Sequence, residues 1–175
     1  MNRISLFSLL MACWFGLSAC GGESVALQPD PYENYVPTLR AFDMIDSYQT
    51  DTAIPQHPPL ALSPYIDYGY FEVFWRVNSL EDYSVTLSIN DRPDFNGAIV
   101  VHSEVCGAGR WCDQRGNLLC EYTTDFYMSC DNSSSEADIA PLFTGHFPEP
   151  LYLLMEVCDL DSNYCEYDYH PVAME

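Results

Sequence analysis

The chain has 175 residues and a formal net charge of −20 at pH 7, from 26 Asp or Glu and six Lys or Arg. A surface this acidic repels phosphate backbones and anionic lipid headgroups, which argues against nucleic-acid binding. It favours cations or basic partners, although adaptation to a saline environment would explain the charge equally well. The length suits one domain rather than two.

The first residues have the features of an export signal. Arg3 provides a short positive segment, and an apolar run from Ile4 to Leu17 follows it. This run is too short to span a bilayer comfortably, but its length suits the hydrophobic region of a signal peptide. We therefore predict a signal peptide over residues 1–19.

The apolar run ends in Leu17-Ser18-Ala19-Cys20, which resembles the lipobox of bacterial lipoprotein precursors at every position. The resemblance implies cleavage before Cys20 and its modification with diacylglycerol and a further acyl chain such as palmitate. Several acyl chains on one residue anchor a protein stably where one chain would not. Gly21 stands where Asp would favour retention in the inner membrane, so the resemblance implies the outer membrane, on either face. An ordinary secretory signal with an incidental cysteine is the alternative.

Residues 20–64 follow as a proline-rich stretch, and we predict that they form a tether between membrane and domain. Within it, Val36, Leu39, Phe42 and Ile45 recur at helical spacing. This spacing predicts a short helix that either docks on the domain or serves as an interaction segment for a partner.

Beyond residue 64 the pattern changes to alternation of apolar and polar residues. It is clearest in YFEVFWRVN (70–78) and YSVTLSIN (83–90), and continues in GAIVVHSEV (97–105), where Ile99, Val101 and Val105 are expected to face inward. Alternating strands recur in LLCEYTTDFYM, LYLLMEV and YCEYDYH. Short alternating strands between turn residues indicate an all-β domain over residues 65–175.

The number and length of these strands fit a β-sandwich of immunoglobulin-like or fibronectin-III-like architecture. Trp75 suits the central core position of such a sandwich. The cysteine-tryptophan-cysteine order of true immunoglobulin domains is absent, because every cysteine of the domain follows Trp75. A small jelly roll or an open barrel are the alternatives.

Cys13 belongs to the signal peptide and Cys20 to the lipobox, which leaves six cysteines for the domain. An even number in an exported chain predicts three disulfides. A zinc site is the rival, but no Cys-x-x-Cys pair occurs. We predict sequential pairing, 106–112, 120–130 and 158–165, of Cys106, Cys112, Cys120, Cys130, Cys158 and Cys165.

The histidines His57, His102, His146 and His170 are the only side chains that ordinarily titrate near neutral pH. None stands in a catalytic motif, and His102 is expected on a solvated strand face beside Glu104. We therefore expect a lipoprotein that acts by binding or structural association, with a protein or glycan partner, rather than an enzyme. A hydrolase whose residues converge on folding is the alternative.

The segment CGAGRWC (106–112) places Arg110 and Trp111 in a glycine-containing loop between two cysteines. A disulfide there would hold both side chains exposed at little conformational cost, and both residue types are frequent at binding hot spots. We therefore predict a binding role for Arg110 and Trp111. The alternative is a connecting loop whose tryptophan folds back on the sandwich.

The segment after Cys158 has oxygen-bearing residues at alternate positions, Asp159, Asp161 and Asn163, as calcium loops do. It is not an EF-hand, because Tyr164 stands where Gly is required and His170 where Glu is required. We expect no cofactor; a calcium site at these residues is the alternative prediction, and it would suit a calcium-dependent module for a glycan or protein. Turn hydrogen bonds are the structural alternative, and zinc through His170 and Asp168 is a further one.

The pairing of Cys158 with Cys165 depends on the register of a hairpin. If the two lie directly opposite, apolar residues of the first strand share a face with Glu166 and Asp168. A shift by one residue turns Tyr167 inward but separates the cysteines. A bulge at the tip would reconcile both requirements, or each cysteine pairs elsewhere, and the register stays open at this point.

Overall fold

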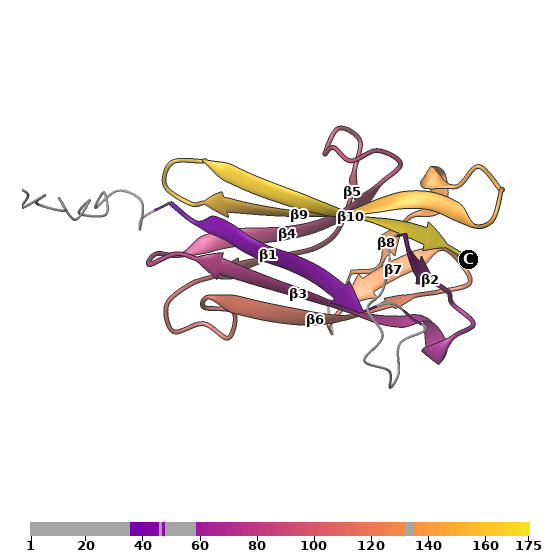
Figure 1. Cartoon of the computed structure of the whole chain (residues 1–175), viewed down its shortest axis with the longest axis horizontal. Helices are drawn as coiled ribbons and strands as arrows, with labels where there is room; N and C mark the ends of the chain where they lie inside the picture. Colours follow the sequence, from indigo (N-terminus) through magenta and orange to yellow (C-terminus); the bar gives the residue numbers. More distant parts are fainter. Residues whose placement is uncertain (1–35, 46, 48–58, 132–134) are drawn as a thin grey trace, which may run out of the picture. The chain divides into compact units, whose positions relative to one another are not determined.

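The domain consists of two β-sheets that lie face to face (Figure 1). In this computed structural model the described residues are 36–45, 47, 59–131 and 135–175, all within the unit Pro31–Glu175. The strands are β1 (Thr38–Ile45), β2 (Leu60–Leu62), β3 (Tyr70–Asn78), β4 (Tyr83–Asn90), β5 (Ile99–Cys106), β6 (Arg115–Tyr122), β7 (Tyr127–Cys130), β8 (Ala137–Asp138), β9 (Glu149–Asp159) and β10 (Cys165–Met174).

The first sheet has the order β1-β3-β6-β7-β8 and the second the order β2-β10-β9-β4-β5. Neighbouring strands are antiparallel except β2, which runs parallel to the end of β10. The helical elements in the described part of the chain are two short 3-10 turns, Asp67–Gly69 and Ala140–Leu142. No helix among these residues has the length and apolar character needed to cross a membrane. The prediction of an all-β domain is confirmed.

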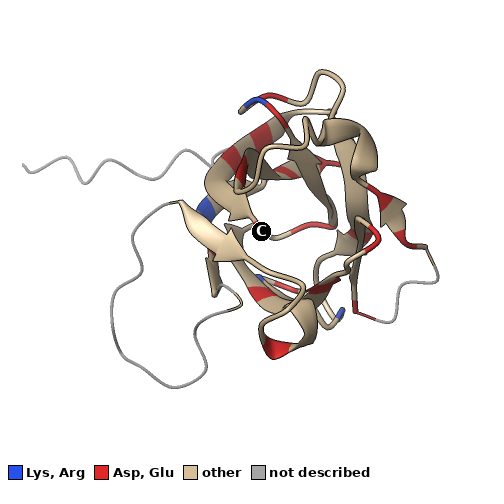
Figure 2. Ribbon diagram, turned by 90° about the vertical axis from the view of Figure 1, so that its right-hand side faces the viewer, with Lys and Arg blue, Asp and Glu red and all other residues tan. Residues whose placement is uncertain are grey.

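The core forms where the alternating strands turn their apolar residues inward. In β3 the residues Phe71, Val73, Trp75 and Val77 are buried, and β4 buries Tyr83, Val85, Leu87 and Ile89 in the same alternation. Figure 2 shows acidic residues distributed over strands and loops on every side of the domain. Both strands and the core position of Trp75 agree with the prediction.

The helix predicted around residues 36–45 is wrong, because these residues form strand β1. Phe42 and Met44 are buried while Ala41 and Asp43 are exposed, which is the alternation of a strand. The edge of β3 pairs with β1 along its length, and this long-range pairing outweighs the weak helical spacing. Strands β1 and β2 both lie within residues 20–64, so part of the predicted tether belongs to the two sheets.

Three disulfides join the six cysteines of the domain in sequential pairs. They link Cys106 with Cys112, Cys120 with Cys130, and Cys158 with Cys165. The second and third bridges connect residues that lie directly opposite in the pairs β6–β7 and β9–β10. The predicted connectivity is confirmed.

The β9–β10 hairpin keeps the direct register without a bulge. Glu166 and Asp168 of β10 therefore lie on the same face of the hairpin as Val157 and Met155, the apolar residues opposite them in β9. Glu166 Oε2 accepts a hydrogen bond of 2.8 Å from the Leu39 amide of β1, and His170 Nε2 lies 2.9 Å from the Phe42 carbonyl oxygen. The polar side of β10 thus faces the backbone of β1, where the edges of the two sheets meet.

Trp75 occupies its place in the core because its partner in β6 has no side chain. Trp75 is 2% exposed and lies directly opposite Gly116 in the β3–β6 pair. A Cβ atom on Gly116 would overlap the six-membered ring of the indole. The close approach of this ring to the backbone therefore requires glycine at position 116.

Substitution Gly116→Ala should lower the free energy of unfolding by about 1–3 kcal/mol, the usual cost of overpacking a core. Urea denaturation measures this change. The neighbouring Asn117→Ala, on the exposed face of the same strand, should change stability by less than about 0.5 kcal/mol. Equal losses in both variants would show that the indole does not press on residue 116.

Candidate functional site

The loop between β5 and β6 is held by a disulfide and by the hydroxyl of one buried tyrosine. The Cys106–Cys112 disulfide closes it, and the buried Tyr83 hydroxyl donates from below toward the carbonyl oxygens of Cys112 (3.1 Å) and Asp113 (2.5 Å). Burial raises the pKa of Tyr83 to about 12, so the phenol stays protonated and keeps its donor. The loop is therefore a rigid support for the residues it carries.

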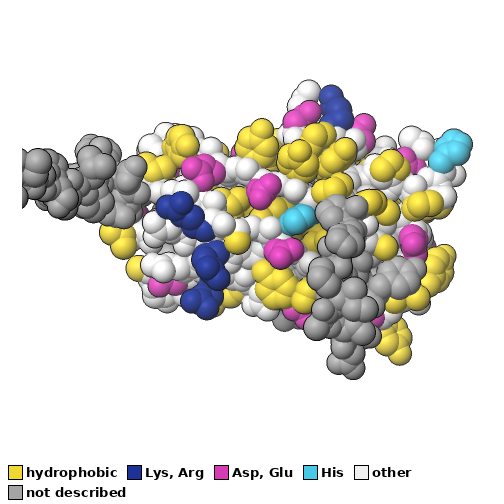
Figure 3. Space-filling model, in the orientation of Figure 1, with side chains coloured by type: hydrophobic (Ala, Val, Ile, Leu, Met, Phe, Trp, Pro, Cys, Tyr) yellow, Lys and Arg dark blue, Asp and Glu magenta, His cyan; other side chains and the backbone are white. Residues whose placement is uncertain are grey.

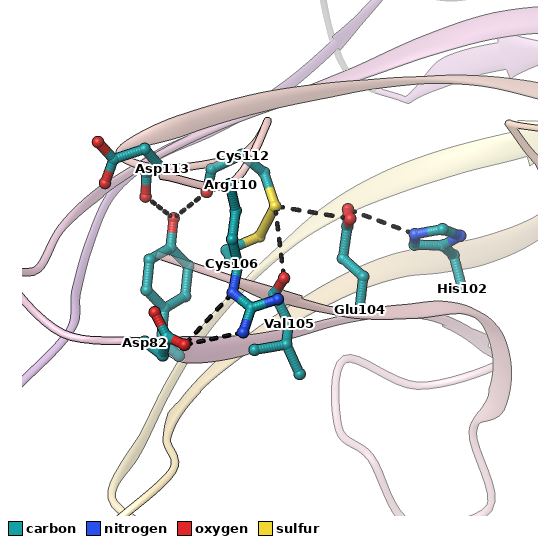
Figure 4. Close-up of a disulfide and its surroundings, with 9 residues drawn as sticks. Asp82, His102, Glu104, Val105, Cys106, Arg110, Cys112 and Asp113 are labelled. Carbon is teal, nitrogen blue, oxygen red and sulfur yellow. Dashed lines mark hydrogen bonds and ion pairs between the residues drawn. A yellow bond between two sulfur atoms is a disulfide. The ribbon is translucent and has the colours of Figure 1, made fainter. Parts of the chain in front are cut away.

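Arg110 and Trp111, the predicted binding pair, have different surroundings. Arg110 forms an ion pair of 2.8 Å with Asp82, which Figure 4 shows beside the disulfide. Trp111 is 59% exposed, and its ring meets Trp75 edge to face with 6.0 Å between centroids. Trp111 thus leans on the core while most of its side chain stays accessible, whereas the Arg110 charge already has a partner.

His102 and Glu104 form a half-buried pair on β5. Their side chains are 13% and 14% exposed, with 3.3 Å between His102 Nε2 and Glu104 Oε1 (Figure 4). Burial raises the pKa of Glu104, opposed by His102 and by the indole N–H of Trp111, while the charge of Asp131 adds to the increase. Glu104 Oε2 also lies 3.5 Å from Cys112 Sγ, a disulfide sulfur that offers no thiol.

The expected solvated position of His102 is wrong, and so is the inward position of Val105. A bulge in the β4–β5 pairing near Leu87 and Ser88 places Leu87 opposite His102. His102, Glu104 and Cys106 therefore share the inner face, and Val105 is 39% exposed. One extra residue in a strand reverses the side on which all following residues lie.

A pocket of about 470 Å³ opens on the outer face of the first sheet, beside the exposed Trp111. Strands β1, β3 and β6 and the loop before β6 contribute to it. Its lining residues are Ala41, Asp43, Phe74, Trp75, Arg76, Trp111, Arg115, Gly116 and Asn117.

Two rows of side chains cross the strands at this pocket. Arg76 lies directly between Ala41 of β1 and Arg115 of β6, and both arginines are exposed. The second row consists of the next outward-facing positions along the same strands. In it, Phe74 of β3 lies between Asp43 of β1 and Asn117 of β6. The pocket thus has a basic row and, about 7 Å away along the strands, a row with an aromatic ring between two hydrogen-bonding side chains.

The basic side chains form a column over β1, β3 and β6 (Figure 3). The column consists of Arg40, at the bulge in β1, together with Arg76 and Arg115. The ion pairs among the described residues are Arg92–Asp91 and Arg110–Asp82, together with His102–Glu104 when the imidazole is protonated, so none includes this column. Three arginines without an acidic partner in the described part of the chain therefore stand together on a protein with a net charge of −20.

The sequence indicated Trp111 but not its neighbours in the pocket. Arg76 and Arg115 are 39 positions apart, and only the pairing of Trp75 with Gly116 brings them opposite each other. The one signal in the sequence that would have suggested this register is that the large side chain of Trp75 needs a residue without a side chain opposite it, as Gly116 is.

The predicted calcium ligands lie at the β9–β10 turn. Asp159 Oδ2 accepts hydrogen bonds from the Ser162 hydroxyl and, at 2.7 Å, from the Ser162 amide. These bonds lower the pKa of Asp159. Asp161 and Asn163 are exposed, and Asn163 adopts a left-handed backbone conformation with φ 56°. The turn-forming alternative is present, and calcium binding at this turn stays a prediction.

Within the described residues, two other clusters combine metal-ligating residue types, and both include a disulfide. Glu104 lies with Cys106 and Cys112, and Glu156 with the two cysteines of the β9–β10 hairpin. All four sulfurs are bridged, so each cluster keeps a single carboxylate. Of the remaining histidines, His146 lies 3.4 Å from the Thr144 hydroxyl, and His57 falls outside the described residues. Cys20, the predicted lipidation site, also falls outside them.

Comparison with known proteins finds no matching family model, no matching curated protein and no matching solved structure. Function is therefore inferred from the chemistry of the pocket.

Substitution Glu104→Gln should alter how stability depends on pH. Because burial raises the folded pKa of Glu104, the unfolded chain releases this proton first, from about pH 4.3 upward. The wild type therefore loses stability as pH rises through that value toward the raised pKa, and the variant should lose less. Thermal melting across this range measures the difference, and Ser103→Ala should behave as the wild type. Parallel profiles of wild type and Glu104→Gln would contradict the raised pKa.

Proposed function

We propose that this domain is a binding module that takes an anionic ligand on the outer face of its first sheet. The observation that carries the proposal is the directly opposed pair Arg76 and Arg115, without an acidic partner in the described residues. Like charges directly opposite in a sheet destabilise it. An anion bound between the two guanidinium groups would remove this repulsion.

The chemistry of the pocket supports this role. Guanidinium groups bind carboxylates and phosphates through paired hydrogen bonds, and arginine is less strongly hydrated than lysine. Phe74 and Trp111 add apolar surface beside the charges. A concave site with aromatic walls and a few convergent polar groups is the usual form of a ligand pocket.

The proposal extends to the architecture, which we take to be immunoglobulin-like or fibronectin-III-like. It is supported by the order β10-β9-β4, which corresponds to strands G, F and C of an immunoglobulin domain. It is also supported by the order β1-β3-β6, in which β6 takes the place of strand E beside strand B. The departure is that β7 and β8 follow β6, whereas strand D precedes E in immunoglobulin domains.

We also propose that the chain is anchored to the outer membrane through lipid on Cys20. The support is the lipobox resemblance of Leu17-Ser18-Ala19-Cys20, which lies outside the described residues. Anchoring and ligand binding together describe a surface or periplasmic module that holds an anionic molecule close to the membrane.

Binding of a mixed panel of anions tests the proposed function. The panel contains polygalacturonate, alginate, poly-L-glutamate and inorganic phosphate, and titration calorimetry on the full chain measures affinity. We expect at least one anion to bind, and Arg76→Ala or Arg115→Ala to weaken it about tenfold or more, as loss of a charged hydrogen bond does.

Arg92→Ala is the matched control. It removes the same charge from an exposed arginine that pairs with Asp91 at 3.2 Å, away from the pocket. Its affinity should equal that of the wild type. The proposed function is wrong if no anion of the panel binds, or if Arg92→Ala weakens binding as much as Arg76→Ala.

A further inference from the structure

We infer that the anionic ligand is a hexuronate, a sugar whose ring carries one carboxylate, as a residue of an acidic polysaccharide. This inference rests on the proposed anion binding at the same pocket. It follows from the two rows of side chains in the pocket, one basic and the other with an aromatic ring between two hydrogen-bonding side chains.

The two rows of the pocket set where the ligand can carry charge. Arg76 and Arg115 stand opposite each other in the basic row, with strands about 4.8 Å apart, so both can reach one carboxylate. Asp43 stands in the other row, about 7 Å along the strands. Because Asp43 is itself acidic, a second negative charge at this end of the ligand would be repelled. The ligand is therefore anionic at one end and neutral at the other.

The second row suits hydroxyl groups around a ring. Asp43 can accept hydrogen bonds, and the Asn117 amide can both donate and accept them. Phe74 lies between these two side chains and offers the face or edge of its ring. A pyranose ring has an apolar face with hydroxyls around its rim, so it matches an aromatic ring between two such partners.

The position of the pocket on the sheet argues against an acidic peptide. Extended peptides usually bind by adding a strand at a sheet edge, where free backbone groups pair with them. At the centre of the pocket the backbone of Phe74 is paired on both sides, with β1 and β6, so the pocket presents side chains there. At residues 115–117 β6 has no second partner strand among the described residues, because its pairing with β7 covers 120–122, so this argument applies to the centre of the pocket. A glutamate side chain would also leave the second row without hydroxyl partners.

The overall charge argues against densely charged polyanions. The chain carries a net charge of −20, and its basic groups at this site number three, Arg40, Arg76 and Arg115. A polymer with several charges per repeat would be repelled by the net negative charge of the chain. One carboxylate per sugar spaces the charges along the polymer and limits this repulsion.

Trp111 makes the pocket specific for a rigid ligand. Its ring is held edge to face against Trp75, and its loop is closed by the disulfide and bonded to Tyr83. A wall that is already ordered loses little side-chain freedom when a ligand binds. A sugar ring, which is rigid itself, gains most from such a preformed wall.

The experiment compares polymers that differ in one property, using the full chain. Polygalacturonate and alginate carry a carboxylate on a pyranose ring, methyl-esterified galacturonan keeps the ring without the charge, and poly-L-glutamate keeps the charge without the ring. We expect either uronate polymer to bind at least tenfold tighter than the ester and the polypeptide. Quenching of tryptophan fluorescence, together with calorimetry, follows the binding.

Variants separate the two rows of the pocket. Phe74→Leu and Asp43→Asn should each weaken uronate binding several-fold, and Asp43→Asn should leave poly-L-glutamate binding equal or stronger. Arg92→Ala should change neither, and thermal melting confirms that each variant is folded. If poly-L-glutamate binds the wild type as tightly as both uronates, the uronate inference is wrong while anion binding stands. If no polymer and no other anion binds, both fail.

Discussion

The register between β3 and β6 is the constraint on which the rest of this molecule depends. It places Trp75 opposite Gly116 on the inside, which allows the indole to lie against bare backbone. The same register places Arg76 opposite Arg115 and Phe74 opposite Asn117 on the outside. One strand pairing therefore determines both the packing of the core and the set of side chains that line the proposed binding pocket.

The buried tryptophan also connects the core to the loop before β6. Trp111 rests on Trp75, and its neighbour Cys112 is tied both to Cys106 and to the Tyr83 hydroxyl. Tyr83 belongs to the second sheet and the pocket to the first. Support for the pocket wall thus comes from both sheets, which explains how an exposed aromatic ring can be held in one place.

The features that the sequence predicted correctly are those determined by nearby residues. The alternation in β3 and β4 marks both strands, and sequential cysteines a few positions apart can meet only by local turns. The errors arose where distant partners decide. β1 is a strand because the edge of β3 accepts it, and His102 faces inward because β5 bulges against β4. The arginine column required a pairing between segments 39 positions apart, which no local pattern records.

The disulfides have a consequence for how the chain acquires its covalent structure. Their partners are separated by six, ten and seven positions, and no bridge encloses another. A chain that enters an oxidising compartment from its amino end would therefore complete each bridge before the next two cysteines arrive. Pairing each cysteine with the next one to arrive would then give the correct connectivity, and a disulfide isomerase would have few wrong pairings to correct.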